Sequence, residues 1–151
     1  SNIKPLSFFA RFSAIFAPAP EIDRRIIRRT NPPVFGLEMF QKLRDSRVVF
    51  NNHIDISPKS ASNMRLFEAT GVGACLLTDW KENLPELFEP DAEVLTYKSA
   101  AECVEKVNYI LEHETERRQI AEAGQRRTLR EHTFENRAAR IDEIIYGLIK
   151  N

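Results

Sequence analysis

Three short apolar runs constrain the fold of this chain most strongly. They span Arg47 to Phe50, Ala74 to Thr78 and Glu93 to Tyr97, and apolar and polar residues do not alternate within them. Runs of this kind, rich in Val and Leu, are typical of parallel strands that are covered on both faces. A fourth candidate strand is Leu6 to Ala10. The runs therefore predict a parallel sheet buried between two layers.

Helical patterns lie between the runs. The first spans Gly36 to Asp45, and a second extends from about Ser62 to Thr70. Gly71 and Gly73 end the second pattern and are predicted to form a tight turn before the next strand. A segment with four arginines, from Pro18 to Pro33, is predicted to begin as a helix and to end in a proline-containing turn.

Longer helices are predicted for the rest of the chain. Ser99 and Glu102 have the spacing of a capping box, and apolar residues follow at helical spacing: Cys103, Val107, Ile110 and Leu111. Two more helices begin near Thr115 and Thr133, and the last has an apolar series in register: Phe134, Ala138, Ile141, Ile145 and Leu148. The alternation predicts an α/β, Rossmann-like three-layer sandwich with right-handed crossovers, closed by the C-terminal helices.

Length and charge limit the classes of function. A length of 151 residues predicts a single domain over residues 1–151, and 22 basic against 22 acidic residues give no net charge to attract nucleic acid. The apolar stretch Leu6 to Ala19 is interrupted by Arg11, so we expect no integral membrane segment and no signal peptide. Cys75 and Cys103 fall at apolar positions, as expected for core residues of a cytoplasmic protein.

Polar residues follow the strands at the edge where a ligand is expected. In an open parallel sheet, ligands bind beyond the carboxyl ends of the strands, which selects Arg11, the group Asn51 to Asp55, and Thr78 with Asp79. His53 lies within this group, where a neutral imidazole could donate to a sugar or phosphate oxygen. A lone histidine beside a strand end is more often structural.

A second candidate region is the segment SPKSASNMRLFE, Ser57 to Glu68, which reads as a polar loop entering a helix. A helix start presents free N–H groups and the positive end of its dipole to a phosphate, and Lys59 and Arg65 would add charge. The alternative is a capped helix with a surface loop. Arg65 and Glu68 also have the spacing of an ordinary ion pair.

Catalytic residues are not identified by any pattern. No metal-ligand spacing, Cys/His pairing or Ser/His/Asp order occurs, and Asp55 with Asp79 does not make a metal site. We therefore predict that the chain uses no metal and no other cofactor.

The segment NMRLFEATGVGACLLTDWKENLPELFEP, Asn63 to Pro90, resembles the C-terminal domain of bacterial group 1 glycosyltransferases, particularly the spore-maturation-protein-like branch. The resemblance continues through VLTYKSAAECVEKVNYIL and AGQRRTLREHTFENR, and back to FGLEMFQKLRDSRVVFNNHIDIS; LSFFARFSAIF is similar to that domain's opening strand. It implies the donor-binding half of a GT-B fold, in which a second, N-terminal domain presents the acceptor. Ser1 and Asn2, read as a cloning scar, fit a fragment of a longer hexosyltransferase that binds the nucleotide-sugar donor without turnover.

The resemblance also implies roles for particular residues. Glu68 matches the glutamate that bonds the donor ribose hydroxyls, since a carboxylate accepts two hydrogen bonds at once. Arg11 matches the basic residue that meets the donor phosphates. Ser62 and Asn63, with their backbone, would meet the diphosphate or the sugar, while Arg65 assists or only braces Glu68. Fixed N–H dipoles and an arginine would stabilise the charge on the leaving diphosphate without a metal ion.

Two departures from the family pattern bear on the donor site. Many group 1 enzymes have a second glutamate at the place of Ser60, so the contacts of the donor sugar are open. A second basic residue after Arg11 is also not evident, which leaves Lys59 as an alternative phosphate contact.

Two other functions compete with donor binding. A receiver-type regulatory domain would use Asp79 as a phosphoacceptor, but the acidic pair that it needs after the first strand is missing. A non-catalytic interaction module would act through the Arg/Glu-rich C-terminal helices, and Ser60 in place of glutamate fits such a loss of catalysis. Failure to bind any nucleotide would favour the interaction module.

Overall fold

The computed structural model describes residues 22–53 and 58–150. The chain divides into two units, Ser1–Pro33 and Val34–Asn151. The described part of the first unit holds the short helix α2, Arg24–Ile27, which confirms that the arginine-rich segment begins as a helix. The expected strand Leu6 to Ala10 and Arg11 lie outside the described residues. The single domain over residues 1–151 stays a prediction.

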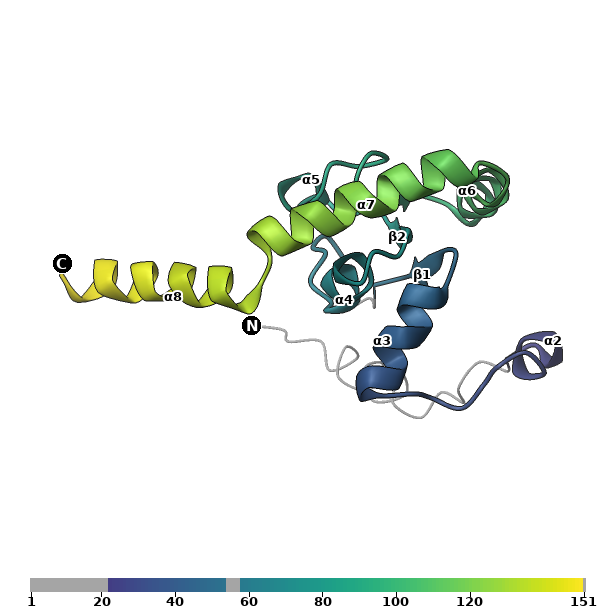
Figure 1. Ribbon diagram of the computed structural model, residues 1–151, viewed down its shortest axis with the longest axis horizontal. Coiled ribbons are helices and arrows are strands. Elements are labelled where there is room, and N and C mark those ends of the chain that lie inside the picture. The colour runs from purple at the N-terminus through teal and green to yellow at the C-terminus, as the bar shows by residue number, and fades with distance from the viewer. Residues whose placement is uncertain (1–21, 54–57, 151) are drawn as a thin grey trace, which may run out of the picture. The chain divides into compact units, whose positions relative to one another are not determined.

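The second unit is built on a three-stranded parallel sheet with the strand order β1-β2-β3; Figure 1 labels β1 and β2. The strands are β1, Val49–Asn51; β2, Leu76–Asp79; and β3, Leu95–Tyr97. In the register, Phe50 lies opposite Leu77, and Leu77 lies opposite Leu95. The three apolar runs are therefore confirmed as strands, and each strand begins two residues later than its run.

Helices cover both faces of the sheet, as the buried runs predicted. In chain order they are α3, Gly36–Asp45; α4, Arg65–Gly71; α5, Leu84–Leu87; α6, Ala100–Glu112; α7, Glu114–Glu131; and α8, Phe134–Ile149. One core cluster joins Leu76 to Leu66 of α4 and Leu84 of α5. The other joins Leu77 to Ile110 of α6 and Ile120 of α7. Adjacent leucines of β2 thus point into opposite layers, which gives the predicted α/β sandwich.

The helix starts differ in detail from the sequence patterns. The helix expected from Ser62 begins at Arg65. At α6, the Ser99 side chain accepts from the N–H of Glu102, as predicted, but the Glu102 carboxylate accepts from the N–H of Lys98. A capping box would return this bond to Ser99 itself, so only half of the predicted box is present.

The turn between α4 and β2 confirms the role predicted for its glycines. Gly73 has φ +78°, a left-handed conformation that side chains rarely adopt, and its N–H donates to the carbonyl of Thr70. The chain therefore reverses in a few residues and enters β2 directly.

The two C-terminal helices behave differently: the first packs closely on the sandwich, and the second is exposed along its length. Helix α7 buries Ile120, Ala121, Gly124 and Thr128, whereas α8 has no buried residue. Figure 1 shows α8 continuing beyond the end of α7. The apolar series predicted for α8 is therefore in register but lacks a partner surface among the described residues.

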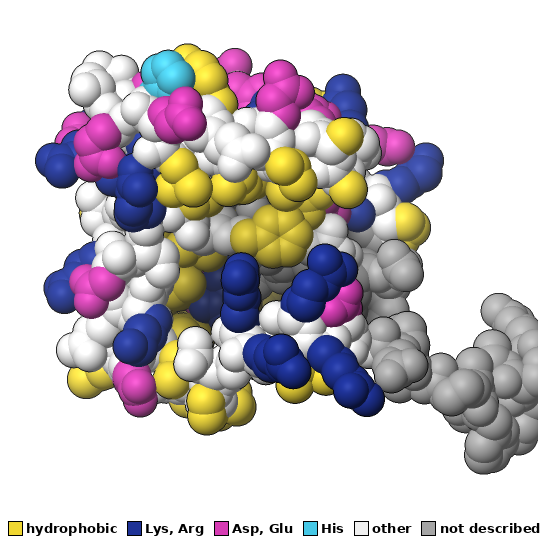
Figure 2. All heavy atoms as spheres, turned by 90° about the vertical axis from the view of Figure 1, so that its right-hand side faces the viewer, with side chains coloured by type: hydrophobic (Ala, Val, Ile, Leu, Met, Phe, Trp, Pro, Cys, Tyr) yellow, Lys and Arg dark blue, Asp and Glu magenta, His cyan; other side chains and the backbone are white. Residues whose placement is uncertain are grey.

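Charged side chains of both signs are interspersed over much of the face shown in Figure 2, with exposed hydrophobic side chains among them. In the described part of the chain, no helix is both long and apolar enough to cross a membrane.

Candidate functional site

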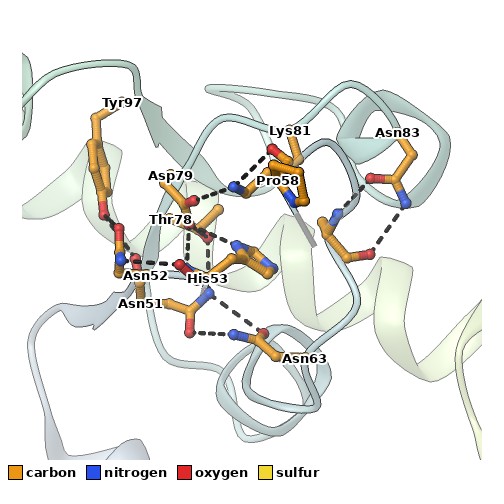
Figure 3. Close-up of polar contacts among 11 residues, drawn as sticks. Asn51, Asn52, His53, Pro58, Asn63, Thr78, Asp79, Lys81, Asn83 and Tyr97 are labelled. Atoms are coloured by element: carbon orange, nitrogen blue, oxygen red, sulfur yellow. Dashed lines mark hydrogen bonds and ion pairs between the residues drawn. The ribbon is translucent and has the colours of Figure 1, made fainter. Parts of the chain in front are cut away.

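A network of polar side chains lies at the carboxyl ends of the strands (Figure 3). Asn51, the last residue of β1, donates through Nδ2 to Thr78 Oγ1 of β2 at 2.9 Å. Asn63, in the loop before α4, donates to Asn51 Oδ1 at 2.8 Å. Asn51 and Thr78 are buried, because neighbouring strands and the loop cover them. Two strand ends and the loop are thus tied together through one side chain.

His53 and Asp79 form the charged centre of this network. Asp79 Oδ1 accepts from the backbone N–H of His53 at 2.9 Å and contacts its Nδ1 at 2.6 Å, while Lys81 Nζ lies 3.1 Å from the other carboxylate oxygen. Burial alone would raise the pKa of Asp79, but the hydrogen bonds from His53 and Lys81 outweigh it and lower the pKa. The carboxylate is therefore ionised at neutral pH and makes Nδ1 the donor.

This geometry bears on the expected role of His53, whose contact with the donor stays a prediction. The N–H that was predicted to meet a sugar or phosphate is used on Asp79 instead, so the structural alternative is favoured. The side chain of His53 is 2% exposed. Among the described residues, its Nε2 has no hydrogen-bond partner. In the neutral imidazole this nitrogen is an acceptor.

Tyr97 and Asn52 belong to the same network; Asn52 falls in the predicted group Asn51 to Asp55, whereas the sequence patterns did not single out Tyr97. The Tyr97 hydroxyl donates to the carbonyl oxygen of Asn51 at 3.1 Å and lies 2.9 Å from Asn52 Oδ1. Burial, with the nearby charge of Asp79, raises the pKa of Tyr97 to about 12, so the hydroxyl stays protonated. Applying the strand-end rule to the third strand would have selected Tyr97. We call the set the edge network: Asn51, Asn52, His53, Asn63, Thr78, Asp79, Lys81 and Tyr97.

Hydrogen bonds attach the loop before α4 to residues 81–83. Lys81 Nζ donates to the Pro58 carbonyl at 3.1 Å, and the backbone N–H of Glu82 donates to the Lys59 carbonyl at 2.9 Å. Asn83 bonds both backbone polar groups of Ala61. The side chain of Lys59 points elsewhere and pairs with Glu82 at 3.4 Å, with both side chains exposed.

The predicted ion pair between Arg65 and Glu68 is confirmed, with Nη1 and Oε2 3.2 Å apart. Glu68 is mostly buried, since 19% of its side chain is exposed. Glu68 and Ser62 line a hollow of about 490 Å³ between α3, α4 and the junction of α7 with α8. The structure therefore does not place Glu68 and Ser62 in the edge network, but beside it along the same loop and helix.

A second hollow, of about 670 Å³, lies over the strand ends on the side of α6. Asp79 and Asn52 line its polar part. Its other walls are mainly apolar or aromatic, and Lys98 Nζ lies 4.7 Å from the centre of the Trp80 ring. The predicted site residues thus fall into separate groups: His53, Asn63, Thr78 and Asp79 lie in the edge network, and Ser62 with Glu68 lines the hollow of about 490 Å³. Lys59 and Arg65 make the ion pairs described above and line neither hollow, and Arg11 lies outside the described residues.

Metal ligands and cysteines bear on the chemistry of the site. Within residues 22–53 and 58–150, no group of three or more His, Cys, Asp or Glu side chains is placed to hold a metal ion. Cys75 and Cys103 are free. Burial raises the pKa of the Cys75 thiol to about 11, so Cys75 behaves as an unreactive core residue. Metal-free chemistry stays a prediction.

Comparison with known proteins identifies the family. A family model described as glycosyl transferase-like matches residues 14–143, which is most of the chain. No curated protein and no solved structure matches this chain. The matched range contains the whole edge network and Glu68, together with every strand of the sheet. The chain therefore belongs to the glycosyl transferase-like family.

Proposed function

We propose that this chain binds the nucleotide-sugar donor of a glycosyltransferase at the edge network and at the start of α4. The observation that carries the proposal is the position of the edge network at the carboxyl ends of parallel strands, in a chain of the glycosyl transferase-like family. Ligands of open α/β sheets bind in this position.

The start of α4 supports binding of a diphosphate. The N-cap residue Met64 makes no side-chain cap bond to the first turn of α4. The positive end of a helix dipole suits a phosphate, and Arg65 lies at the first position of α4. Arg11 remains a proposed phosphate contact.

Glu68 supports recognition of the ribose. Its carboxylate lines a hollow of about 490 Å³, and the bond to Arg65 leaves its second oxygen available to a ligand hydroxyl. Arg65 holds the carboxylate in place from one turn earlier. Asn63 and Ser62 are proposed to contact the diphosphate or the sugar from the loop that leads to Glu68.

The chemistry follows from charge. As the bond to the sugar breaks, the diphosphate gains negative charge, and fixed N–H dipoles with an arginine stabilise that charge without a metal ion. We also propose that the full enzyme is a hexosyltransferase of the spore-maturation-protein-like branch. A further domain would bind the acceptor. A cytoplasmic location fits the free thiols of Cys75 and Cys103.

One observation favours a second candidate function. Helix α8 exposes large apolar side chains along its length, among them Ile141, Ile145 and Leu148. Exposed apolar faces of this kind mark interaction surfaces. An interaction module would use α8 and would bind no nucleotide.

Calorimetric titration with UDP, GDP, ADP and their sugars distinguishes the two. We expect one nucleotide series to bind with a Kd between micromolar and millimolar, and Glu68→Ala to weaken binding about tenfold or more, since it removes hydrogen bonds to a charged group. The matched control is Glu143→Ala, which removes the acidic member of another i,i+3 ion pair, Arg140–Glu143, on α8. Binding that Glu68→Ala leaves intact, or no binding at all, contradicts the proposal.

A further inference from the structure

Asn83 stands at the start of a helix but its side chain does not cap that helix. Asn83 is the N-cap residue of α5, yet its side chain makes no cap bond there. Asparagine is among the best capping residues, so a local preference is left unused. The side chain instead reaches Ala61, 22 positions earlier in the chain.

The contact with Ala61 uses the whole amide. The N–H of Ala61 donates to Asn83 Oδ1 at 2.6 Å, and Asn83 Nδ2 donates to the Ala61 carbonyl at 3.1 Å (Figure 3). Ala61 is 4% exposed, so water does not satisfy these backbone groups. A buried backbone donor and acceptor must find partners, and one side chain supplies both.

The neighbours of Asn83 extend this contact along the loop. Lys81 and Glu82 bond the carbonyls of Pro58 and Lys59, so three consecutive residues hold three positions of the loop. The same Lys81 also pairs with Asp79 of the edge network. The loop is therefore attached to the segment after β2 rather than only to its own neighbours.

The far end of the loop is held by a second asparagine contact. Asn63 and Asn51 bond each other, with Nδ2 of Asn63 2.8 Å from Oδ1 of Asn51. Ser62 lies between the two fixed points, and α4 with Glu68 begins just beyond them. Both ends of the stretch from Ala61 to Asn63 are thus set by side-chain amides.

We propose that Asn83 is a positioning residue for donor binding: it presets the loop 58–63, and so the entry to α4, before the nucleotide arrives. The inference rests on the proposed function of the same site. A loop that is already ordered loses less conformational freedom on binding, so its fixation raises affinity without a new contact to the ligand. Asn83 itself contacts no nucleotide in this account.

The variant Asn83→Asp isolates this role. Aspartate has the same shape and caps α5 equally well, and it still accepts from the Ala61 N–H, but it cannot donate to the Ala61 carbonyl. We expect its affinity for UDP, GDP or ADP, whichever the wild type binds, to fall about fivefold to tenfold. The amide of Ala61 should also lose protection in hydrogen exchange. Asn83→Ser, which removes both bonds, serves if Asn83→Asp does not fold.

Two controls separate positioning from general destabilisation. Asn136→Asp makes the same chemical change at the capping box of α8 and should leave nucleotide affinity unchanged. Ile110→Val lowers stability in the core cluster against α6, away from the loop. It should leave nucleotide affinity unchanged even where its loss in Tm matches that of Asn83→Asp. Equal losses of affinity in Ile110→Val and Asn83→Asp would overturn the inference.

The remaining outcomes are distinct from one another. If the wild type binds a nucleotide and Asn83→Asp binds it equally well while the Ala61 amide loses protection, the positioning role is wrong and the proposed function stands. If the Ala61 amide keeps its protection in Asn83→Asp and affinity still falls, the effect does not pass through the loop and the inference also fails. If the wild type binds no nucleotide, the proposed function fails and the inference fails with it.

Discussion

Helices α7 and α8 follow one another in the chain, and their burial is the opposite of what their sequences suggest. Helix α7, ETERRQIAEAGQRRTLRE, is largely charged, yet it packs against both α4 and α6. Helix α8, FENRAARIDEIIYGLI, carries the stronger apolar series, yet none of its residues is buried. An apolar stripe shows that a helix needs a partner, but not that the partner is within the same chain segment.

Small residues explain why α7 packs closely. A Cβ added at Gly124 would lie 2.3 Å from the carbonyl oxygen of Glu93, so only glycine allows the helix to approach the chain just before β3. Thr128 and Thr70 of α4 bond each other through their buried hydroxyls at 2.6 Å. The contact is therefore short and specific rather than broadly hydrophobic.

The largest expected change in stability comes from making the same substitution, glycine to alanine, in each of the two helices. Gly124→Ala should lower the free energy of unfolding by about 3 kcal/mol, because overpacking against a backbone oxygen exceeds the gain of about 1 kcal/mol in helix propensity. Gly147→Ala in α8 meets nothing within 4 Å and should stabilise the chain slightly. Denaturant unfolding measures both changes. Equal effects of the two substitutions would contradict the contrast between α7 and α8.

A smaller effect is expected at the edge network. Asp79→Asn should lower the unfolding free energy by about 2 kcal/mol at neutral pH, since the bonds from His53 then go to a neutral acceptor and the ion pair with Lys81 is lost. The pKa of Asp79 is lowered in the folded protein, so this stabilisation is complete above the ordinary aspartate pKa of about 3.9 and is lost as the pH falls through the lower folded value. The fluorescence of Trp80, the only tryptophan, reports unfolding beside Asp79.

The pH dependence of stability is the control for the Asp79→Asn prediction. In Asp79→Asn, the stability difference from the wild type should shrink on acidification, because the wild-type carboxylate becomes protonated. A difference that stays constant down to pH 2 would show that Asp79 contributes through packing rather than through charge. The same substitution should leave the helicity of α8 unchanged, which separates the edge from the exposed helix.

The smallest effect is expected on the apolar face of α8. Ile145 is 48% exposed, so Ile145→Ala should change the unfolding free energy by less than about 0.5 kcal/mol. Ile120→Ala in α7, where the side chain is 4% exposed, should cost about 3 kcal/mol as a matched change. A cost at Ile145 close to that at Ile120 would mean that α8 packs on a surface of its own chain.

The sequence predicted those features that depend on local patterns. The apolar runs became strands covered on both faces, the glycines before β2 formed a tight turn, and Arg65 paired with Glu68. Strand-end position also brought His53 and Asp79 together. Each of these follows from residue periodicity, chain reversal or spacing along a helix, which a single sequence contains.

Contacts between distant segments could not be predicted in the same way. Asn83 reads as a helix cap in the sequence, and only the fold shows that it bonds Ala61 instead. The use of the His53 N–H on Asp79 likewise depends on the spacing of two strands. The exposure of α8 follows from what surface lies beside it, which no periodicity encodes.

Mapping a nucleotide diphosphate sugar onto the chain by amide chemical shifts tests the central claim most directly. We predict that titration shifts the amides of the loop 58–63, the start of α4 and the strand-end residues His53 and Asp79, while α8 from Ile141 onward stays unchanged. Shifts concentrated in α8 from Ile141 onward, or no shift with any of the UDP, GDP and ADP sugars, would contradict donor binding at the edge network.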